Sequence, residues 1–498
     1  MSKKKIFRNS SFYMLAGFLP SAVGIITLPL FSRYLSPEEY GVLALIQTMS
    51  AFLPLILTLQ IPSSLRRFYF DFEGDELKSY TSTLFLLVTV GGGLVAYLLN
   101  LYLSEAVEVI FPQSSEGYVG FFHIGLLIAF VNTLGSFNGL LLRVRQQPKA
   151  YMTVALIAFF TALAVNLILV TGFQWGARGM LIGQLAGGSV ALAGYLLQNI
   201  GQFCLKLKPS ILKGSIIYAL PLIPSALTNN TYFYSDRIIL DRHVSLGLIG
   251  LYGFSGRIAW TFKKLVNEFN EAFLPHFMKT ALKDKHTATR EAAHVADIFL
   301  FLLSLALAFV ALFSFEILGF FFDPRYLGAW FMVPVLCSAY FFRSVYCFSV
   351  AGILFSKKTK FMPMITATAA VVSILLNVLL IPRFGVMAAA WVMVASFFVS
   401  SILASLWSRH TLFIPLRYGR ILIYYSFFLL ALWGGWSIHR TESIFTEWNF
   451  NSLFILKFCI LLPGLALTWF HRRDFFVLMR KFASRKNREE KSTRSLLD

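Results

Sequence analysis

Two arginines stand inside long apolar stretches, where a charged side chain has few polar neighbours in the sequence. Arg257 lies in GLYGFSGRIAWTF and Arg343 lies in SAYFFRSVYCF. A guanidinium stays charged and offers bidentate hydrogen bonds to phosphate or carboxylate oxygens. Anion binding is therefore the chemistry that these two residues favour. The alternatives are a structural ion pair, or a side chain that extends along its stem to a polar boundary.

Two adjacent pairs of charged residues stand at the edges of other apolar stretches. Asp236 and Arg237, in YFYSDRIILDR, could line the entrance to a cavity or couple to a cation, and a local ion pair is the competing interpretation. Arg66 and Arg67, in IPSSLRRFYF, could meet an anion at the other end of a cavity. Membrane topology alone would also place basic residues at such a position.

His123 and Asp297 fall in or beside apolar stretches and are candidates for coupling to a proton or to Na⁺. An imidazole titrates near neutral pH, which suits a proton carrier. A hydrogen-bonded structural role is the alternative for both residues.

Motifs of soluble enzyme chemistry are missing from the sequence. It contains no GxxxxGK[ST] phosphate loop, no HExxH and no GxSxG. Four cysteines lack the spacing of a metal site and are interpreted as small packing residues: Cys204, Cys337, Cys347 and Cys459. We therefore predict no catalytic residue, no metal site and no bound cofactor.

The composition indicates the elements that must position these side chains. The chain has 498 residues, of which 57% are hydrophobic and only 14% are charged, and its mean hydropathy is +0.69. Soluble domains carry about 25% charged residues. An integral membrane protein is the class that fits. The apolar run after the basic N-terminus is too long for a signal peptide core and is interpreted as a first span.

A spanning helix needs about 20 mostly apolar residues, and the sequence offers about fourteen such segments. The strand alternation of an outer-membrane barrel is absent, so we predict an all-α polytopic bundle. The expected spans are 10–32, 40–64, 80–103, 118–142, 150–172, 178–200, 214–238, 244–267, 294–316, 327–353, 361–382, 384–407, 420–438 and 449–470.

Basic residues divide unevenly between alternate loops. With a cytoplasmic N-terminus, 34 of the 44 Lys and Arg residues fall in inner segments, seven in outer segments and three inside spans. This bias follows the positive-inside rule and predicts that both termini are cytoplasmic. It accounts for the net charge of +20 without a nucleic-acid partner. The basic tail is interpreted as a cytoplasmic segment that faces anionic lipid.

Phrases of the sequence return after about 209 residues. FSRYLSPEEYGVLALI, at 31–46, aligns with LDRHVSLGLIGLYGFS, at 240–255, so that Arg33 matches Arg242 and Gly41 matches Gly250. VNLILVTGF, at 165–173, resembles LNVLLIPRF, at 376–384. These matches predict two six-helix lobes related by a parallel pseudo-twofold repeat. The expected parts are 1–205, 206–410, an extra helix pair at 411–470 and the tail at 471–498.

The hinge RYLSPEEYGVLAL after the first span, and YSDRIILDRHVSLGLIGLYGFS after the seventh, give the chain a family resemblance. With fourteen short-looped spans, it resembles the polysaccharide-biosynthesis flippases of the Wzx (O-antigen) type. These belong to the MOP superfamily, together with the MATE drug exporters and the lipid II flippases. The motifs are mainly structural, so they transfer no catalytic residue.

The resemblance implies a function and a cellular place. Family members move an undecaprenyl-pyrophosphate-linked oligosaccharide from the cytoplasmic to the outer leaflet by alternating access, through a cationic central cavity. It implies residence in the bacterial inner membrane, with the bilayer, a polysaccharide polymerase and a chain-length regulator as candidate partners. On this interpretation the intramembrane arginines meet the pyrophosphate. Asparagines could bond the sugar, although helix-to-helix bonding is their default role: Asn132, Asn138, Asn166, Asn229, Asn230 and Asn377.

Two alternatives compete with the flippase. A MATE-like ion-coupled exporter of small molecules would be favoured by acidic groups in the cavity, whereas the clearest intramembrane charges here are arginines. A membrane-embedded polysaccharide polymerase would need a sizeable loop with clustered charges, and the sequence has only short loops. We therefore rank the exporter second and the enzyme last.

Overall fold

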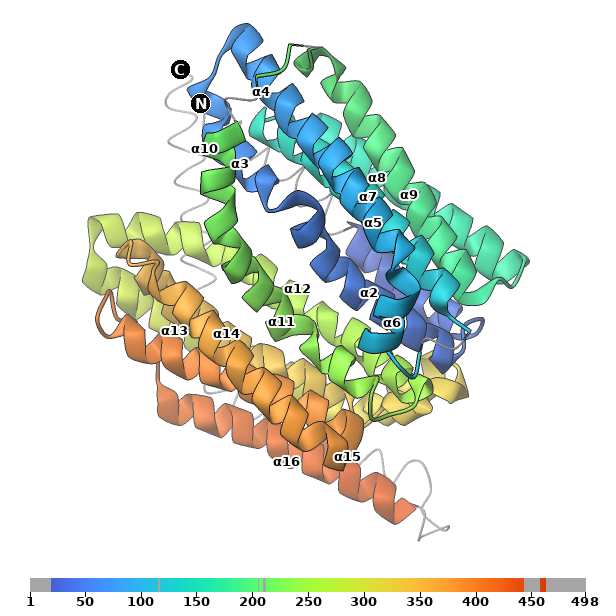
Figure 1. Cartoon of the computed structure of the whole chain (residues 1–498). Helices are drawn as coiled ribbons and strands as arrows, with labels where there is room; N and C mark the ends of the chain where they lie inside the picture. Colours follow the sequence, from blue (N-terminus) through green and yellow to red (C-terminus); the bar gives the residue numbers. More distant parts are fainter. Residues whose placement is uncertain (1–18, 115–116, 205, 209–211, 443–456, 463–498) are drawn as a thin grey trace, which may run out of the picture. The chain divides into compact units, whose positions relative to one another are not determined.

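The computed structural model describes residues 19–114, 117–204, 206–208, 212–442 and 457–462. The regular secondary structure of these residues is entirely helical, and they contain no strand (Figure 1). The fold class predicted from hydropathy is therefore confirmed. The principal helices are α2 (Pro37–Thr58), α3 (Ile61–Phe68), α4 (Gly74–Leu86), α5 (Gly92–Leu101), α6 (Leu103–Ile110), α7 (Val119–Val144), α8 (Pro148–Asn166), α9 (Gly176–Asn199), α10 (Leu212–Ala219), α11 (Ile223–Leu240), α12 (Leu246–Lys283), α13 (Lys285–Phe321), α14 (Val333–Phe355), α15 (Phe361–Ser408) and α16 (Tyr418–Glu442).

Within the described residues, nine helices are long and apolar enough to cross a membrane, and a shorter apolar helix runs from Leu19 to Ser32. The total of fourteen spans remains a prediction. The predicted spans 214–238 and 244–267 are not among these nine helices, and the first of them is divided into α10, a 3₁₀ turn and α11. Parts of the first and last predicted spans lie outside the described residues. The basic tail at 471–498 also lies outside them. Some neighbouring elements join into one span, as α4 and α5 do through the π-helical turn Leu87–Gly91.

The second predicted span, 40–64, is shorter in the structure. It begins at a Ser36 capping box, in which the Ser36 hydroxyl accepts from the Glu39 amide and the Glu39 carboxylate accepts from the Ser36 amide. It ends at Thr58, because Leu59 and Gln60 adopt left-handed φ values of 48° and 61°. The chain then starts a separate short helix, α3, at Ile61.

Helix boundaries differ at three other places. The predicted spans 361–382 and 384–407 fall within α15, which is interrupted by Gly385 with φ 59° and ψ −140°. The helices α12 and α13 extend to Lys283 and from Lys285, well beyond the apolar stretches that predicted them. Helical structure therefore continues into polar sequence, where hydropathy gives no signal.

The chain divides into two compact units. Unit 1 comprises 1–258, 318–329 and 363–396, and unit 2 comprises 259–317, 330–362 and 397–498. The segment Leu318–Ala329 is thus part of unit 1, although the residues on either side of it belong to unit 2. The lobe boundaries predicted from the repeat stay a prediction.

Within unit 1, the two repeated turns contact each other reciprocally. A Cβ on Gly41 would collide with the Leu246 carbonyl oxygen, and a Cβ on Gly250 would collide with the Pro37 carbonyl oxygen. Leu246 stands 209 residues after Pro37, as Gly250 stands 209 after Gly41. Equivalent residues therefore exchange the same contact, which is the pattern expected around a twofold axis. Only glycine permits so close a backbone approach.

Candidate functional site

Unit 1 contains a partly open cavity of about 350 Å³ among its membrane-spanning helices. Arg257 lines it, together with polar side chains from α2, α7, α8 and α9. None of the described residues at its wall is an aspartate or a glutamate. The wall combines these polar groups with aromatic and aliphatic ones: Gly24, Thr27, Leu28, Phe31, Tyr40, Leu43, Ile46, Gln47, Ser50, Ile128, Asn132, Phe159, Ala162, Leu163, Asn166, Met180, Leu181, Gln184 and Arg257.

Arg257 is the positive charge of this cavity. Its side chain is exposed, and its guanidinium carbon lies 5.7 Å from the centre of the Tyr40 ring. Among the described residues, no hydrogen bond or ion pair joins it to another side chain. A charge in an apolar segment, without a counter-charge among the described residues, faces water or a ligand, because hydrocarbon would not solvate it. The prediction that Arg257 lies in a cavity is consistent with this placement.

Three amide side chains share the cavity with Arg257. Gln47, Asn132 and Gln184 are exposed, and none has a hydrogen-bond partner among the described residues. Gly188 leaves room for one of them, since a Cβ there would lie 2.6 Å from the Asn132 Oδ1. Gln47 and Gln184 were missed in the sequence analysis. Their signal was an isolated glutamine in each of the apolar segments VLALIQTMSAFL and GMLIGQLAGG.

A fourth amide, Asn166, lines the cavity from the end of α8 and is only 9% exposed. Its Oδ1 has no hydrogen-bond partner among the described residues. This oxygen lies against α9 at Gly183, where a Cβ would overlap it. A substitution at Gly183 would therefore push Asn166 into the cavity.

Arg343 has a different environment. It lies on α14 in unit 2, is half-buried, and its guanidinium carbon lies 4.6 Å from the centre of the Tyr346 ring. The neighbouring residues on α14 are almost all buried. The cation–π contact with Tyr346 supports a packing role, and a role in cargo binding stays a prediction.

Asp297 belongs to a buried polar cluster in unit 2. It is 5% exposed and accepts hydrogen bonds from Arg417 at 3.4 Å, from Tyr424 at 3.0 Å, and from Arg420. Arg417 and Arg420 are about half-exposed. These contacts support the structural alternative for Asp297, and its ion-coupling role stays a prediction.

Asp236 and Arg237 form the local ion pair that was the competing interpretation. The Arg237 Nη1 lies 3.3 Å from the Asp236 Oδ1, and the Tyr252 hydroxyl donates to the other carboxylate oxygen. His123 lies on α7 with its Nδ1 2.8 Å from the Asn100 Oδ1. Neither group is at the wall of the cavity described here.

Arg66 and Arg67 lie on α3 and are both exposed. Arg67 pairs with Asp71 at 3.1 Å, one helical turn later, and its guanidinium carbon lies 5.1 Å from the Phe68 ring centre. An exposed pair of this kind contributes at most about 1 kcal/mol of stability. The structure does not bring Arg66 or Arg67 to the wall of the Arg257 cavity.

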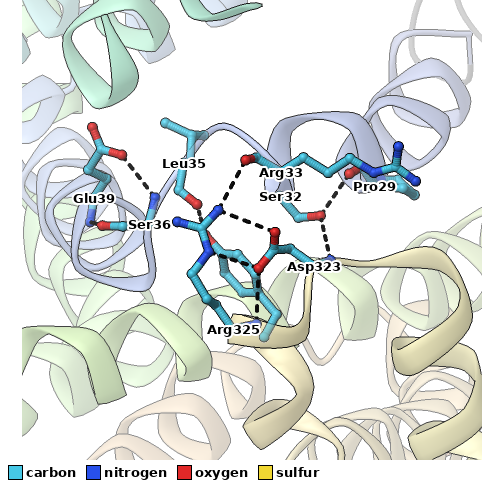
Figure 2. A network of polar contacts seen from close by, with 9 residues as sticks. Pro29, Ser32, Arg33, Leu35, Ser36, Glu39, Asp323 and Arg325 are labelled. Carbon is cyan, nitrogen blue, oxygen red and sulfur yellow. Dashed lines mark hydrogen bonds and ion pairs between the residues drawn. The ribbon is translucent and has the colours of Figure 1, made fainter. Parts of the chain in front are cut away.

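At one end of unit 1, the segment after α13 holds the turn before α2 (Figure 2). The Asp323 amide donates to the Ser32 hydroxyl at 3.3 Å, and the Arg325 Nη2 donates to the Arg33 carbonyl at 3.0 Å. The Tyr326 hydroxyl donates to the Leu35 carbonyl at 2.9 Å. We call these six residues the first clasp.

An internal ion pair fixes the shape of the first clasp. The Arg325 Nε lies 2.8 Å from the Asp323 Oδ1, and the Arg325 amide donates to the same oxygen at 3.0 Å (Figure 2). The hydrogen bonds from Arg325 hold the pKa of the Asp323 carboxyl below its usual range. Asp323 is therefore ionised at neutral pH.

The equivalent turn before α12 is held by the end of α6 and the residues that follow it. The Gln113 amide donates to the Asp241 carboxylate at 3.3 Å, and the Ser114 hydroxyl donates to its other oxygen. The Arg242 Nη2 donates to the Val109 carbonyl at 3.0 Å. Burial raises the pKa of the fully buried Asp241 carboxyl, against the opposing effect of these hydrogen bonds. We call these five residues the second clasp.

Comparison with known proteins agrees with the fold. The chain superposes on "Lipid II flippase MurJ, inward closed conformation" with a TM-score of 0.71 and 14% identity, covering 93% of this chain and 99% of that one. It superposes on an inward-facing multidrug resistance MATE family transporter of the MOP superfamily with a TM-score of 0.63 and 14% identity, over 80% and 95% of the two chains. At such identities the likeness concerns the fold.

Sequence comparison identifies the family. The chain is 23% identical over 308 residues to protein 1 of the Lsg locus of Haemophilus influenzae, a match that covers 60% of this chain and 72% of its relative. The sequence model of the family described as "Polysaccharide biosynthesis protein" matches residues 6–281, which is more than half of the chain. This multi-pass membrane protein, with the fold of MurJ and the MATE transporters, therefore belongs to the polysaccharide biosynthesis protein family.

Proposed function

We propose that this protein moves a polyprenyl-pyrophosphate-linked oligosaccharide, a precursor of a surface polysaccharide, across the bacterial inner membrane. The observation that carries the proposal is Arg257, a cation with no counter-charge among the described residues, in a polar cavity among membrane-spanning helices. A pyrophosphate offers the anionic oxygens that a guanidinium binds bidentately. Its prenyl chain can stay in the bilayer while the head group crosses in a hydrated cavity.

The proposal also includes the direction of transport and the topology of the chain in the membrane. Both termini lie in the cytoplasm, as the bias of basic residues indicates, and the cargo enters from that side. Moving a charged, hydroxylated head group through hydrocarbon would cost tens of kcal/mol in an idealised estimate. A polar cavity replaces the water that the head group would otherwise lose. The protein then exposes the cavity to the two sides in turn.

A MATE-like exporter of small cations has the same fold but needs a different cavity. The described wall of the Arg257 cavity has one guanidinium and no carboxylate. Residues 1–18, which precede the described part of the chain, contain no aspartate or glutamate either. A positive site without an acidic group repels a cationic drug, so the charge of the cavity favours an anionic cargo.

The proposal is tested in a strain that lacks this gene. We expect completed lipid-linked oligosaccharide to accumulate on the cytoplasmic leaflet and surface polysaccharide to fall. Wild type restores both, whereas Arg257→Gln, made at normal levels, does not. Arg178→Gln serves as the matched control, because Arg178 lies in the membrane helix α9 but is not at the described wall of the cavity, and its guanidinium carbon lies 5.7 Å from the Trp175 ring centre. Normal surface polysaccharide with no trapped precursor would contradict the proposal, provided that the strain has no second flippase.

A further inference from the structure

We infer that Gln47, Asn132 and Gln184 form an amide subsite that binds a neutral sugar of the cargo, while Arg257 binds its phosphate. This inference rests on the proposed function and deepens it. The three amides come from α2, α7 and α9, and all of them line the cavity that holds Arg257. Each amide both donates and accepts, as sugar hydroxyls do.

The depth of the amides argues that they serve a ligand. Gln47, Asn132, Gln184 and Arg257 lie between 8 and 13 residues from the first residue of their helices. At 1.5 Å per residue this is about 12–20 Å, close to the middle of a hydrocarbon core of about 30 Å. Amides at this depth normally bond to neighbouring helices. These three lack such partners among the described residues, so water or cargo must satisfy them.

The size and charge of the cavity limit what the subsite accepts. Its volume of about 350 Å³ is near the lower end of the roughly 300–1,000 Å³ that ligand pockets span. One or two sugars fit such a space, and a whole oligosaccharide does not. Because Arg257 lines the same cavity, the sugar that reaches the amides is the one next to the pyrophosphate. The partly exposed Phe159 ring of the wall can pack on its apolar faces.

The test measures how much affinity the sugar adds. Purified full-length protein in nanodiscs is titrated with a polyprenyl pyrophosphate that carries no sugar, and with the same lipid carrying one glucose, galactose, N-acetylglucosamine or 6-deoxyhexose. We expect at least one sugar to tighten binding. Gln184→Leu and Asn132→Leu should each reduce that gain by about 2- to 10-fold and leave the sugar-free lipid unaffected. Gln198→Leu is the control, an exposed amide on α9 away from the cavity.

The outcomes separate this inference from the proposed function. If sugar-free lipid binds and Arg257→Gln weakens it, the flippase proposal stands. The amide subsite is then overturned if no sugar adds affinity, or if the gain survives in both leucine variants. If neither lipid binds, both the amide subsite and the proposed function are overturned. A third sugar should add little further affinity, and a large gain from it would contradict the size limit.

An independent observation carries a second inference: we propose that the two clasps form a reciprocal gate on the outer side of the cavity. Ser32 and Asp241 are equivalent under the 209-residue offset, as are Ser114 and Asp323. The first clasp joins Asp323 to Ser32, and the second joins Ser114 to Asp241. Each repeat therefore holds the turn of the other through equivalent positions, by the Asp323 backbone amide in the first clasp and by the Ser114 hydroxyl in the second.

A layer of aromatic rings connects the first clasp to the cavity. Tyr40 lines the cavity, and its ring centre lies 5.8 Å from that of Phe254 and 5.4 Å from that of Tyr326. The Phe254 and Tyr326 centres are 4.6 Å apart, and all three residues are almost fully buried. The Tyr326 hydroxyl then donates to the Leu35 carbonyl in the first clasp. The rings thus form a continuous chain of contacts from the cavity wall to the first clasp.

The predicted topology places both turns on the outer side. Contacts between equivalent parts of the two repeats must break there when the repeats separate to release cargo. Interactions that exist only in the closed state stabilise that state. The clasps should therefore set how often the cavity opens outward, whatever cargo it carries.

The gate is tested by accessibility, independently of cargo. In a cysteine-free background, Ser50→Cys reports from the cavity wall, and intact cells receive a membrane-impermeant maleimide from outside. Replacing Asp323 and Arg325 by alanine, or Ser114 by alanine, should raise the labelling rate by about tenfold. Arg178→Ala, outside both clasps, should leave it unchanged.

A covalent lock provides the converse test. Ser32→Cys with Asp323→Cys, joined by a short bifunctional maleimide, should stop accumulation of surface polysaccharide, and the two single variants treated alike should not. Unchanged labelling in both opened variants would overturn the gate. Full transport by the cross-linked protein would overturn it as well.

Discussion

Arg257 and Asp297 are both charged residues within long helices, and the structure surrounds them differently. Asp297, in unit 2, is buried and receives hydrogen bonds from Arg417, Arg420 and Tyr424. Arg257, in unit 1, is exposed in a cavity and contacts only the face of the Tyr40 ring among the described residues. A charge that its own protein neutralises holds helices together. A charge left without a partner is available to a ligand.

The largest effect is expected from reversing the charge of the cavity. Arg257→Glu replaces an attraction for pyrophosphate by a repulsion, so transport of the lipid-linked oligosaccharide in proteoliposomes should fall by more than about 100-fold. Arg257→Lys keeps the charge but loses bidentate bonding and should retain part of the activity. The melting temperature should stay unchanged in both. Transport by Arg257→Glu at a tenth of the wild-type rate or more would remove Arg257 from the cargo site.

Breaking the Asp297 cluster should affect folding more than transport. Asp297→Ala leaves two arginines that can return to water and a Tyr424 hydroxyl without its acceptor, which should destabilise the protein by about 1–3 kcal/mol. Thermal unfolding in detergent measures this loss, and transport is normalised to folded protein. A variant with wild-type stability that no longer transports would reverse the comparison and give Asp297 an ion-coupling role.

Arg343 sharpens the comparison, because it is also an arginine within an apolar helix. Arg343→Gln removes a cation–π contact worth about 0.5–2 kcal/mol, so a fall in melting temperature should accompany it. Transport per folded molecule should change by less than about threefold, since that contact is internal to the helix. A transport loss as large as that of Arg257→Gln would place both arginines on the cargo path.

The smallest expected effect is the pH dependence of the stability that Asp323 contributes in the first clasp. Asp323 has a folded pKa below its unfolded value of about 3.9, so its contribution to stability is present above pH 4 and is lost as the pH falls through the folded pKa. Asp323→Asn should therefore melt about 1–3 °C below wild type at pH 7. The difference should vanish at acid pH. A difference that does not change with pH would mean that the ion pair with Arg325 contributes nothing.

Hydropathy and charge bias predicted the helical membrane fold, because both act on long segments. They also placed Arg257 within a helix. The partners at its cavity could not be predicted, since Gln47, Asn132 and Gln184 come from helices far apart in the sequence. The partners of two other candidates could not be predicted either. Asp236 and Asp297 were chosen as charged residues in or beside apolar segments, and the structure supplies both with internal ion-pair partners.

The repeat was more informative than its weak matches suggested. An offset of 209 residues paired Gly41 with Gly250, and the structure brings these turns together through reciprocal contacts. The end of α2 at Thr58 was not predictable, because Leu59 and Gln60 are not residues that favour left-handed backbone. Tertiary packing imposes that conformation, and sequence patterns carry no record of it.

The most direct test of the account is equilibrium binding of a polyprenyl pyrophosphate to the purified protein in nanodiscs, for wild type, Arg257→Gln and Arg178→Gln. We predict that Arg257→Gln weakens binding by about 10- to 100-fold and that Arg178→Gln matches wild type. A cationic drug should bind none of the three. Equal affinity of wild type and Arg257→Gln for the pyrophosphate would contradict the claim that this unpaired arginine receives the anionic cargo.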